Sequence, residues 1–149
     1  TARALDGIPG IASKGIAMGR FEEAERMLLP HLDNLLERAL AHRPLSDSEK
    51  DDHDVLFAGA VSYALQLAHG LKATKWIDWV FRMHTATGQL MEAETIEALH
   101  NLVRNNNYTS PQFLRAYLRV VNNRASDYGA SERFLLRRLE GLEQVVSAY

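Results

Sequence analysis

The chain has 149 residues, of which 46% are hydrophobic and 24% charged, and its net charge at pH 7 is −2. This length allows one self-sufficient hydrophobic core, and the average composition argues against disorder. The near-neutral charge excludes a strong overall attraction to nucleic acid or anionic lipid, and the lack of cysteine excludes disulfides, thiolate metal ligands and cysteine nucleophiles.

Apolar side chains have helical spacing from the first segments onward. The chain has 9 glycines and 4 prolines, too few turn residues for many short strands. Residues 3–18 predict a short or irregular helix that begins near Pro9. Residues 20–43 predict a long helix with a kink at Pro30, because apolar side chains recur there every three or four residues.

The two segments meet at a predicted helical corner formed by Gly19, Phe21 and Ala24. The glycine can take the backbone angles that end a helix, the phenylalanine can fill the junction, and the alanine permits close packing. Together with Ile11 and Ala12, these residues resemble the second half of a tetratricopeptide repeat over about residues 8–32. The resemblance implies a helical array that binds a protein partner, and it implies no particular ligand.

A third helix is predicted over residues 47–69. Residues 46–49 have the pattern of a capping box, and the acidic residues that follow lie where the helix dipole favours negative charge. Capping explains this run better than a calcium loop, which needs a central glycine and a terminal glutamate. Ala60, Ala64 and Ala68 form a ridge of small residues on a mostly apolar segment, so we expect a central helix.

The next two helices are predicted over residues 74–87 and 92–105. The first has Thr74 as its cap and stops at Gly88. It carries three aromatic side chains within a turn and a half, and these cannot all point the same way. We expect two in the core and one on the surface, where it could anchor a partner; the three are Trp76, Trp79 and Phe81.

Two further helices, over residues 111–124 and 131–147, complete the predicted fold. Ser110 caps the first, and Pro111 takes its first helical position. The apolar side chains predicted for the last helix are Phe134, Leu135, Leu139, Leu142 and Val146. Because the linkers are short, we expect one all-α domain over residues 1–149, with about seven helices stacked as antiparallel hairpins in an α-solenoid or a compact bundle.

Arginine is concentrated in the last third of the chain. From Arg104 to Arg138 there are seven arginines against two acidic residues. Four of them form pairs spaced one turn apart and would line one groove if the last two helices are neighbours: Arg115, Arg119, Arg133 and Arg137. Arginine without lysine favours forked recognition of carboxylate or phosphate groups. The alternative is internal pairing with the acidic segment 19–54.

Catalytic and cofactor patterns are weak. No two of the six histidines are four residues apart, but His31, His53, Asp54 and Asp127 resemble the ligand order of HD-type metal-dependent phosphohydrolases, which are also helical. No serine lies in a Gly-x-Ser-x-Gly turn, and no glycine-rich loop continues into Lys-Ser or Lys-Thr. We therefore expect no catalytic residues, metal or cofactor, and keep the phosphohydrolase as an alternative.

These observations predict a non-enzymatic adaptor or scaffold domain. Its partner would be a protein with an acidic or phosphorylated segment, or an amphipathic helix, bound through the four arginines. Self-association is equally open, and a basic-patch nucleic-acid binder is a less favoured alternative. We expect no membrane association, because no segment approaches the ~18 consecutive apolar residues of a membrane span. The chain begins at Thr1 without methionine, which fits either a processed protein or a piece of a longer one. We expect a piece of a longer protein, and a cytoplasmic one.

Overall fold

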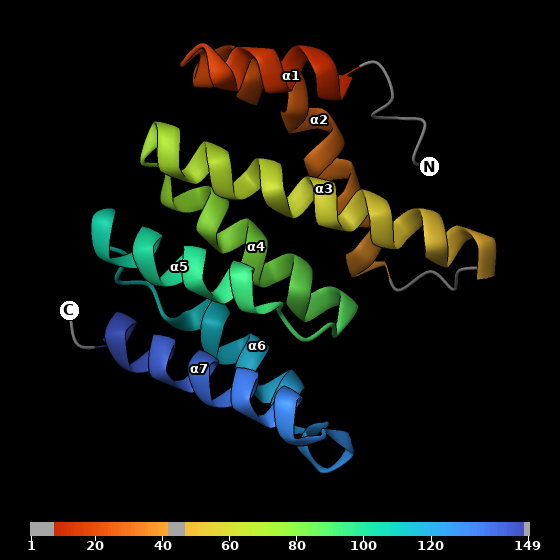
Figure 1. Cartoon of the computed structure of the whole chain (residues 1–149), viewed down its shortest axis with the longest axis vertical. Helices are drawn as coiled ribbons and strands as arrows, with labels where there is room; N and C mark the ends of the chain where they lie inside the picture. The colour runs from red at the N-terminus through yellow and green to blue at the C-terminus, as the bar shows by residue number, and fades with distance from the viewer. Residues whose placement is uncertain (1–7, 42–46, 148–149) are drawn as a thin grey trace. The chain divides into compact units, whose positions relative to one another are not determined.

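The computed structural model describes residues 8–41 and 47–147, with side chains described for 11–41 and 57–147. Within these ranges the chain is all-α and contains no strand, as predicted (Figure 1). The elements are α1 (Ile8–Ala17), α2 (Phe21–Leu40), α3 (Asp47–Leu71), α4 (Thr74–Thr87), α5 (Ala93–Asn105), α6 (Gln112–Asn122), the short 3-10 helix η2 (Ala125–Asp127) and α7 (Ala130–Ser147).

The helices form two compact units, which divide after Trp76 within α4. The first contains α1, α2 and α3, and the second contains most of α4 together with α5, α6 and α7. The single domain expected from the chain length stays a prediction.

In the first unit, the corner between α1 and α2 has the conformation predicted from its glycine. Gly19 has a φ of +77°, a left-handed value that glycine adopts without a steric penalty. Its N–H donates to the carbonyl of Ile16 at 3.0 Å, and the N–H of Arg20 donates to the carbonyl of Gly15 at 2.7 Å. This pair of hydrogen bonds is a Schellman motif, so the last carbonyls of α1 are satisfied without a side-chain cap.

Small residues hold α1 and α2 close together. Ala12 and Ala24 are buried, and a Cβ atom built on Gly15 would lie 3.8 Å from the Cβ atom of Ala24. Ile11, the apolar position that the tetratricopeptide resemblance assigns to α1, is instead 60% exposed. α2 continues through Pro30, which is exposed, and the kink expected there stays a prediction.

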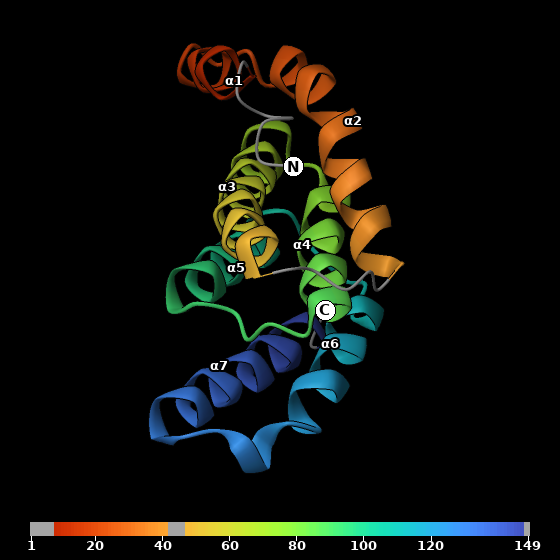
Figure 2. The ribbon, with the colours of Figure 1, turned by 90° about the vertical axis from the view of Figure 1, so that its right-hand side faces the viewer.

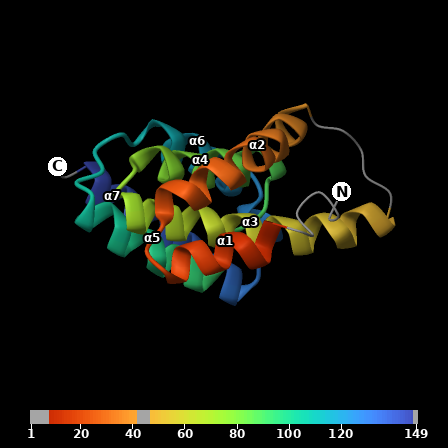
Figure 3. The same cartoon turned by 90° about the horizontal axis from the view of Figure 1, so that it is seen from above.

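α3 carries the small-residue ridge predicted for it. Ala60, Ala64 and Ala68 are completely buried. Farther along the helix, the ring of Phe21 lies against Gly70, in space that any side chain at position 70 would need. α1 lies along α3 and runs in the same direction (Figures 1 and 3), with a hydrogen bond of 3.2 Å between the hydroxyls of Ser13 and Tyr63.

In the second unit, α5 and α7 lie side by side and run in the same direction (Figure 1). α6, which lies between them in the sequence, runs in the opposite direction. Figure 2 shows η2 at the turn that joins α6 to α7. The buried apolar residues of these three helices are Ile96, Leu99, Leu102, Val103, Leu114, Val121, Leu136, Leu139, Leu142 and Val146. Each set recurs every three or four residues, so each helix buries one stripe.

The caps predicted for α6 and α3 have different outcomes. Pro111 occupies the N-cap position of α6, where its carbonyl accepts from the N–H of Arg115 at 2.8 Å, and no side chain caps this helix. The prediction that Ser110 caps α6 is therefore wrong by one residue. Ser46, the first residue of the predicted capping box before α3, lies outside the described residues.

Candidate interaction surface

The four predicted site arginines lie on α6 and α7, which pack against each other. The turn between the two helices is stabilised at the start of α7, where the N–H of Gly129 donates to the side chain of Glu132 at 3.1 Å. A carboxylate three residues into a helix commonly satisfies an otherwise unpaired backbone donor in this way. Because α6 and α7 pack against each other, the condition set for the arginine groove, that the last two helices are neighbours, is met.

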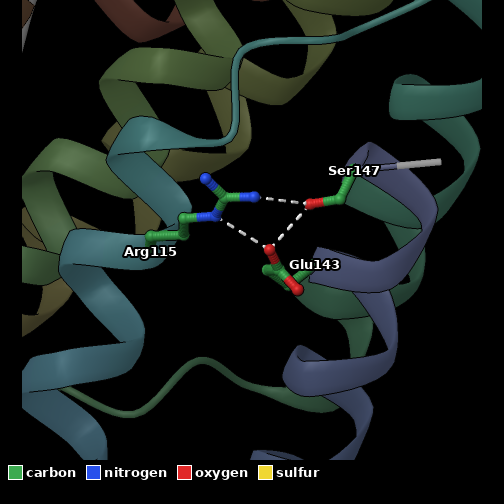
Figure 4. Close-up of polar contacts among 3 residues, drawn as sticks. All are labelled: Arg115, Glu143 and Ser147. Carbon is green, nitrogen blue, oxygen red and sulfur yellow. Dashed lines mark hydrogen bonds and ion pairs between the residues drawn. The ribbon is translucent and has the colours of Figure 1, made fainter. Parts of the chain in front are cut away.

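Arg115 is held by two residues of α7 (Figure 4). Its Nε atom donates to Oε1 of Glu143 at 2.9 Å, and one terminal nitrogen donates to the hydroxyl of Ser147 at 3.0 Å. Ser147 in turn donates to the same carboxylate oxygen at 2.7 Å. The bonds from Ser147 and Arg115 lower the pKa of Glu143 below its usual value. Arg115 thus pairs within its own unit, with two residues of α7.

The side chains of the other three arginines are not held in this way. Arg119, Arg133 and Arg137 are exposed, and none of their guanidinium groups forms an ion pair or hydrogen bond among the residues that the structure describes. At about 100° of rotation per residue, Arg133 and Arg137 project roughly 80–120° away from Glu143 around α7. The side of α7 that Arg115 of α6 contacts is therefore next to the side that carries Arg133 and Arg137. That these arginines converge in one groove stays a prediction.

Phe134 was expected in the apolar face of α7 and is instead 59% exposed, so that prediction is wrong. Leu136 takes the core position. The spacing could have indicated this, because Leu136 continues the three-and-four pattern back from Leu139, whereas Phe134 is five residues from Leu139 and about 140° away from it. An exposed aromatic side chain therefore lies beside Arg133 and Arg137 on the same helix.

The predicted aromatic anchor on α4 is absent. Trp76, Trp79 and Phe81 are each 4% exposed or less, so all three belong to the core and none is on the surface. The indole N–H of Trp76 donates to Oε2 of Glu25 at 2.6 Å, and Lys75 lies 3.3 Å from the same oxygen. A polar partner for the indole nitrogen is what allows tryptophan to be buried at this position.

A shallow open depression in the first unit lies beside this contact. It was not predicted from the sequence. Two carboxylates and two cationic groups line it, so its charge is balanced and it selects no single type of charged ligand. The lining residues are Glu22, Glu25, Arg26, Leu71, Ala73 and Lys75.

Buried polar groups in the second unit have structural roles. The hydroxyl of Tyr117 donates to the carbonyl of Gln89 at 2.6 Å and accepts from the N–H of Met91 at 2.9 Å, which fixes the segment between α4 and α5. His84 is 3% exposed, and its Nδ1 lies 2.7 Å from the carbonyl of Val80. Burial lowers the pKa of His84 to about 4, so the ring is neutral at pH 7.

A second tyrosine holds the residues that follow α5. The hydroxyl of Tyr108 donates to the carboxylate of Asp78 on α4. Burial raises the pKa of Asp78, and this hydrogen bond acts in the opposite direction. The Tyr108 pKa is raised by burial and by the neighbouring carboxylate. The two side chains are hydrogen-bonded to each other, which indicates a contact that stabilises the fold rather than a reactive site.

The phosphohydrolase alternative rests on residues that the structure describes only in part. His31 is half-buried on α2 and Asp127 is exposed in η2, while the side chains of His53 and Asp54 lie outside those described. Among the described residues, no three histidine, aspartate or glutamate side chains are grouped so as to hold a metal ion.

None of the described helices combines the length and apolar character that crossing a membrane requires. A scan against protein-family models, a search of curated proteins and a search of solved structures each found no match to this chain.

Proposed function

We propose that this chain is a helical protein-interaction module, an adaptor or scaffold, that binds an acidic segment of a partner through α6 and α7. The observation that carries the proposal is the exposure of Arg119, Arg133 and Arg137 without an ionic partner among the described residues. Unpaired guanidinium groups are well suited to forked hydrogen bonds with carboxylates.

The charge distribution favours an acidic protein over nucleic acid. Residues 77–149 contain eight arginines, no lysine and eight acidic residues, so this half of the chain has no net charge. Nucleic-acid binding draws on a continuous basic surface that releases many counterions. A local group of arginines within a neutral unit is better matched to a short acidic segment.

The four arginines are expected to contribute unequally. Arg115 already donates to Glu143 and Ser147, so an incoming carboxylate would have to compete with an existing pair. The guanidinium groups of Arg119, Arg133 and Arg137 have no partner to release within the part of the chain that the structure describes. Exposed ion pairs contribute only about 0.2–1 kcal/mol each, so several arginines must act together for a measurable affinity.

The test uses a labelled acidic amphipathic peptide selected from a random display library against the whole chain. Its affinity is measured by fluorescence anisotropy at two salt concentrations. Replacing Arg119, Arg133 and Arg137 together by alanine should weaken binding at least about tenfold and flatten the salt dependence. The control replaces Arg20, Arg26 and Arg38 of α2 and its corner, which removes the same charge. Equal losses in both variants, or tighter binding of single-stranded RNA than of the peptide, would overturn the proposal.

A further inference from the structure

The most exposed aromatic side chain described in the second unit stands on α7. Phe134 is 59% exposed, while the residues that α7 buries are on other sides of the helix. Isolated apolar side chains are common on protein surfaces, so this exposure alone indicates nothing. What distinguishes Phe134 is the set of residues that accompany it.

Phe134, Arg137 and Gly141 form a strip along α7, since residues spaced by three, four and seven share one side of a helix. A Cβ atom built on Gly141 would meet nothing within 4 Å, so the strip is open at that point down to the helix backbone. Gly141 lies about 10 Å beyond Phe134 along the axis. We call these three residues the α7 strip.

Positive charge surrounds the aromatic end of the α7 strip. The first nine residues of α7 contain three arginines and one glutamate. Arg133 and Arg137 are exposed on either side of Phe134 along the chain. A partner that covers the phenyl ring therefore brings its own charges close to these guanidinium groups, and carboxylates are favoured there.

These features point to one kind of occupant, and we propose that the α7 strip docks an acidic amphipathic helix. An apolar side chain of that helix would cover Phe134, its carboxylates would pair with Arg133 and Arg137, and its backbone would approach α7 most closely at Gly141. Aromatic and arginine side chains contribute most to binding at interfaces, and a glycine allows two helices to approach closely. This inference rests on the proposed function and names its partner and its central contact.

The experiment uses the acidic peptide described above and two matched serine variants. Phe134→Ser should weaken binding about tenfold or more while leaving the salt dependence unchanged, because it removes an apolar contact and no charge. Ile11→Ser on α1 is the control, since Ile11 is 60% exposed and Phe134 is 59% exposed. The control should bind the peptide as the unmodified chain does.

A third variant tests the close approach without weakening α7. Gly141→Leu should block docking while α7 stays folded by circular dichroism, because leucine forms helix better than glycine. If Phe134→Ser and Gly141→Leu bind the peptide normally while the arginine variant does not, the docking inference is wrong and the proposed function stands. If the arginine variant also binds normally, both are wrong. An effect of Phe134→Ser on self-association alone would likewise overturn the inference.

Discussion

The ring of Phe21 on α2 occupies the space that a side chain at position 70 of α3 would need, so Gly70 is part of the contact between the two helices. This pairing connects the α1–α2 corner to α3. It explains why a glycine is tolerated near the end of a long helix, where it would otherwise lower helix stability.

The first prediction concerns this contact. Gly70→Ala should lower the free energy of unfolding by about 1–3 kcal/mol, because the added methyl group overlaps the Phe21 ring. Gly59→Ala on the same helix is the control: a Cβ atom there meets nothing within 4 Å, so alanine should stabilise α3 by roughly 0.5–1 kcal/mol. Urea denaturation measures both. Equal effects of the two substitutions would show that Phe21 does not require a glycine at position 70.

The second prediction concerns Tyr117. Removing its hydroxyl in Tyr117→Phe leaves the N–H of Met91 and the carbonyl of Gln89 without their partner, which should cost about 1–3 kcal/mol of unfolding free energy. Tyr128→Phe is the control, because no hydrogen bond of that hydroxyl is formed among the described residues. Thermal melting should show a clear drop for Tyr117→Phe alone. If the melting temperature drops equally in both variants, the hydrogen bonds of Tyr117 are not the cause and the prediction is wrong.

The third prediction is a pH dependence of stability. The pKa of His84 falls from 6.5 in the unfolded chain to about 4 when it is buried, so protons bind the unfolded state first as the pH decreases. The stability due to neutral His84 is fully present above about pH 6.5 and declines toward pH 4, by about 3 kcal/mol in total. His84→Gln should therefore flatten the stability profile in this range.

The measurement for His84 is urea denaturation at several pH values. Other groups titrate in the same range, and the difference between the variant and the unmodified chain isolates the contribution of His84. His69→Gln provides the control, since His69 is exposed on α3. A profile for His84→Gln that stays as steep as that of the control would contradict burial of a neutral ring.

The fourth prediction concerns Arg115 and follows from the proposed function. Glu143→Gln weakens the internal partner of Arg115 and leaves the arginine available to an acidic peptide, so peptide affinity should rise about two- to tenfold. The stability change should stay below about 1 kcal/mol, because the Arg115 side chain is 54% exposed and solvent weakens the ion pair. Fluorescence anisotropy measures the affinity. A fall in affinity would indicate that Arg115 needs Glu143 to hold it in a binding geometry.

The predicted ends of α4, α5 and α7 are confirmed, whereas the predicted end of α3 at residue 69 falls short of the observed end at Leu71. Gly19 and Gly88 have positive φ values and end α1 and α4. Lys72 and Asn107 have positive φ values at the ends of α3 and α5, although lysine rarely adopts them. Backbone hydrogen bonds after these two residues, such as that from Ala73 to Ala68 at 3.3 Å, compensate for the unfavourable angle.

The candidate site was predicted less completely than the fold. The four arginines were proposed from their spacing and stay a prediction as a site. The sequence could not indicate that Arg115 is bound by Glu143 and Ser147, because these contacts join residues 28 and 32 positions apart. Phe134 was missed as a surface residue since an apolar side chain near a helical stripe is expected to be buried.

By itself, the sequence determined the seven α-helices of the described residues and their approximate ends, since periodicity and glycine act over a few neighbouring residues. Only the tertiary structure decided which apolar residues are buried, because burial depends on every element that surrounds a helix. This is why Trp76, Trp79 and Phe81 are all in the core while Phe134 is exposed.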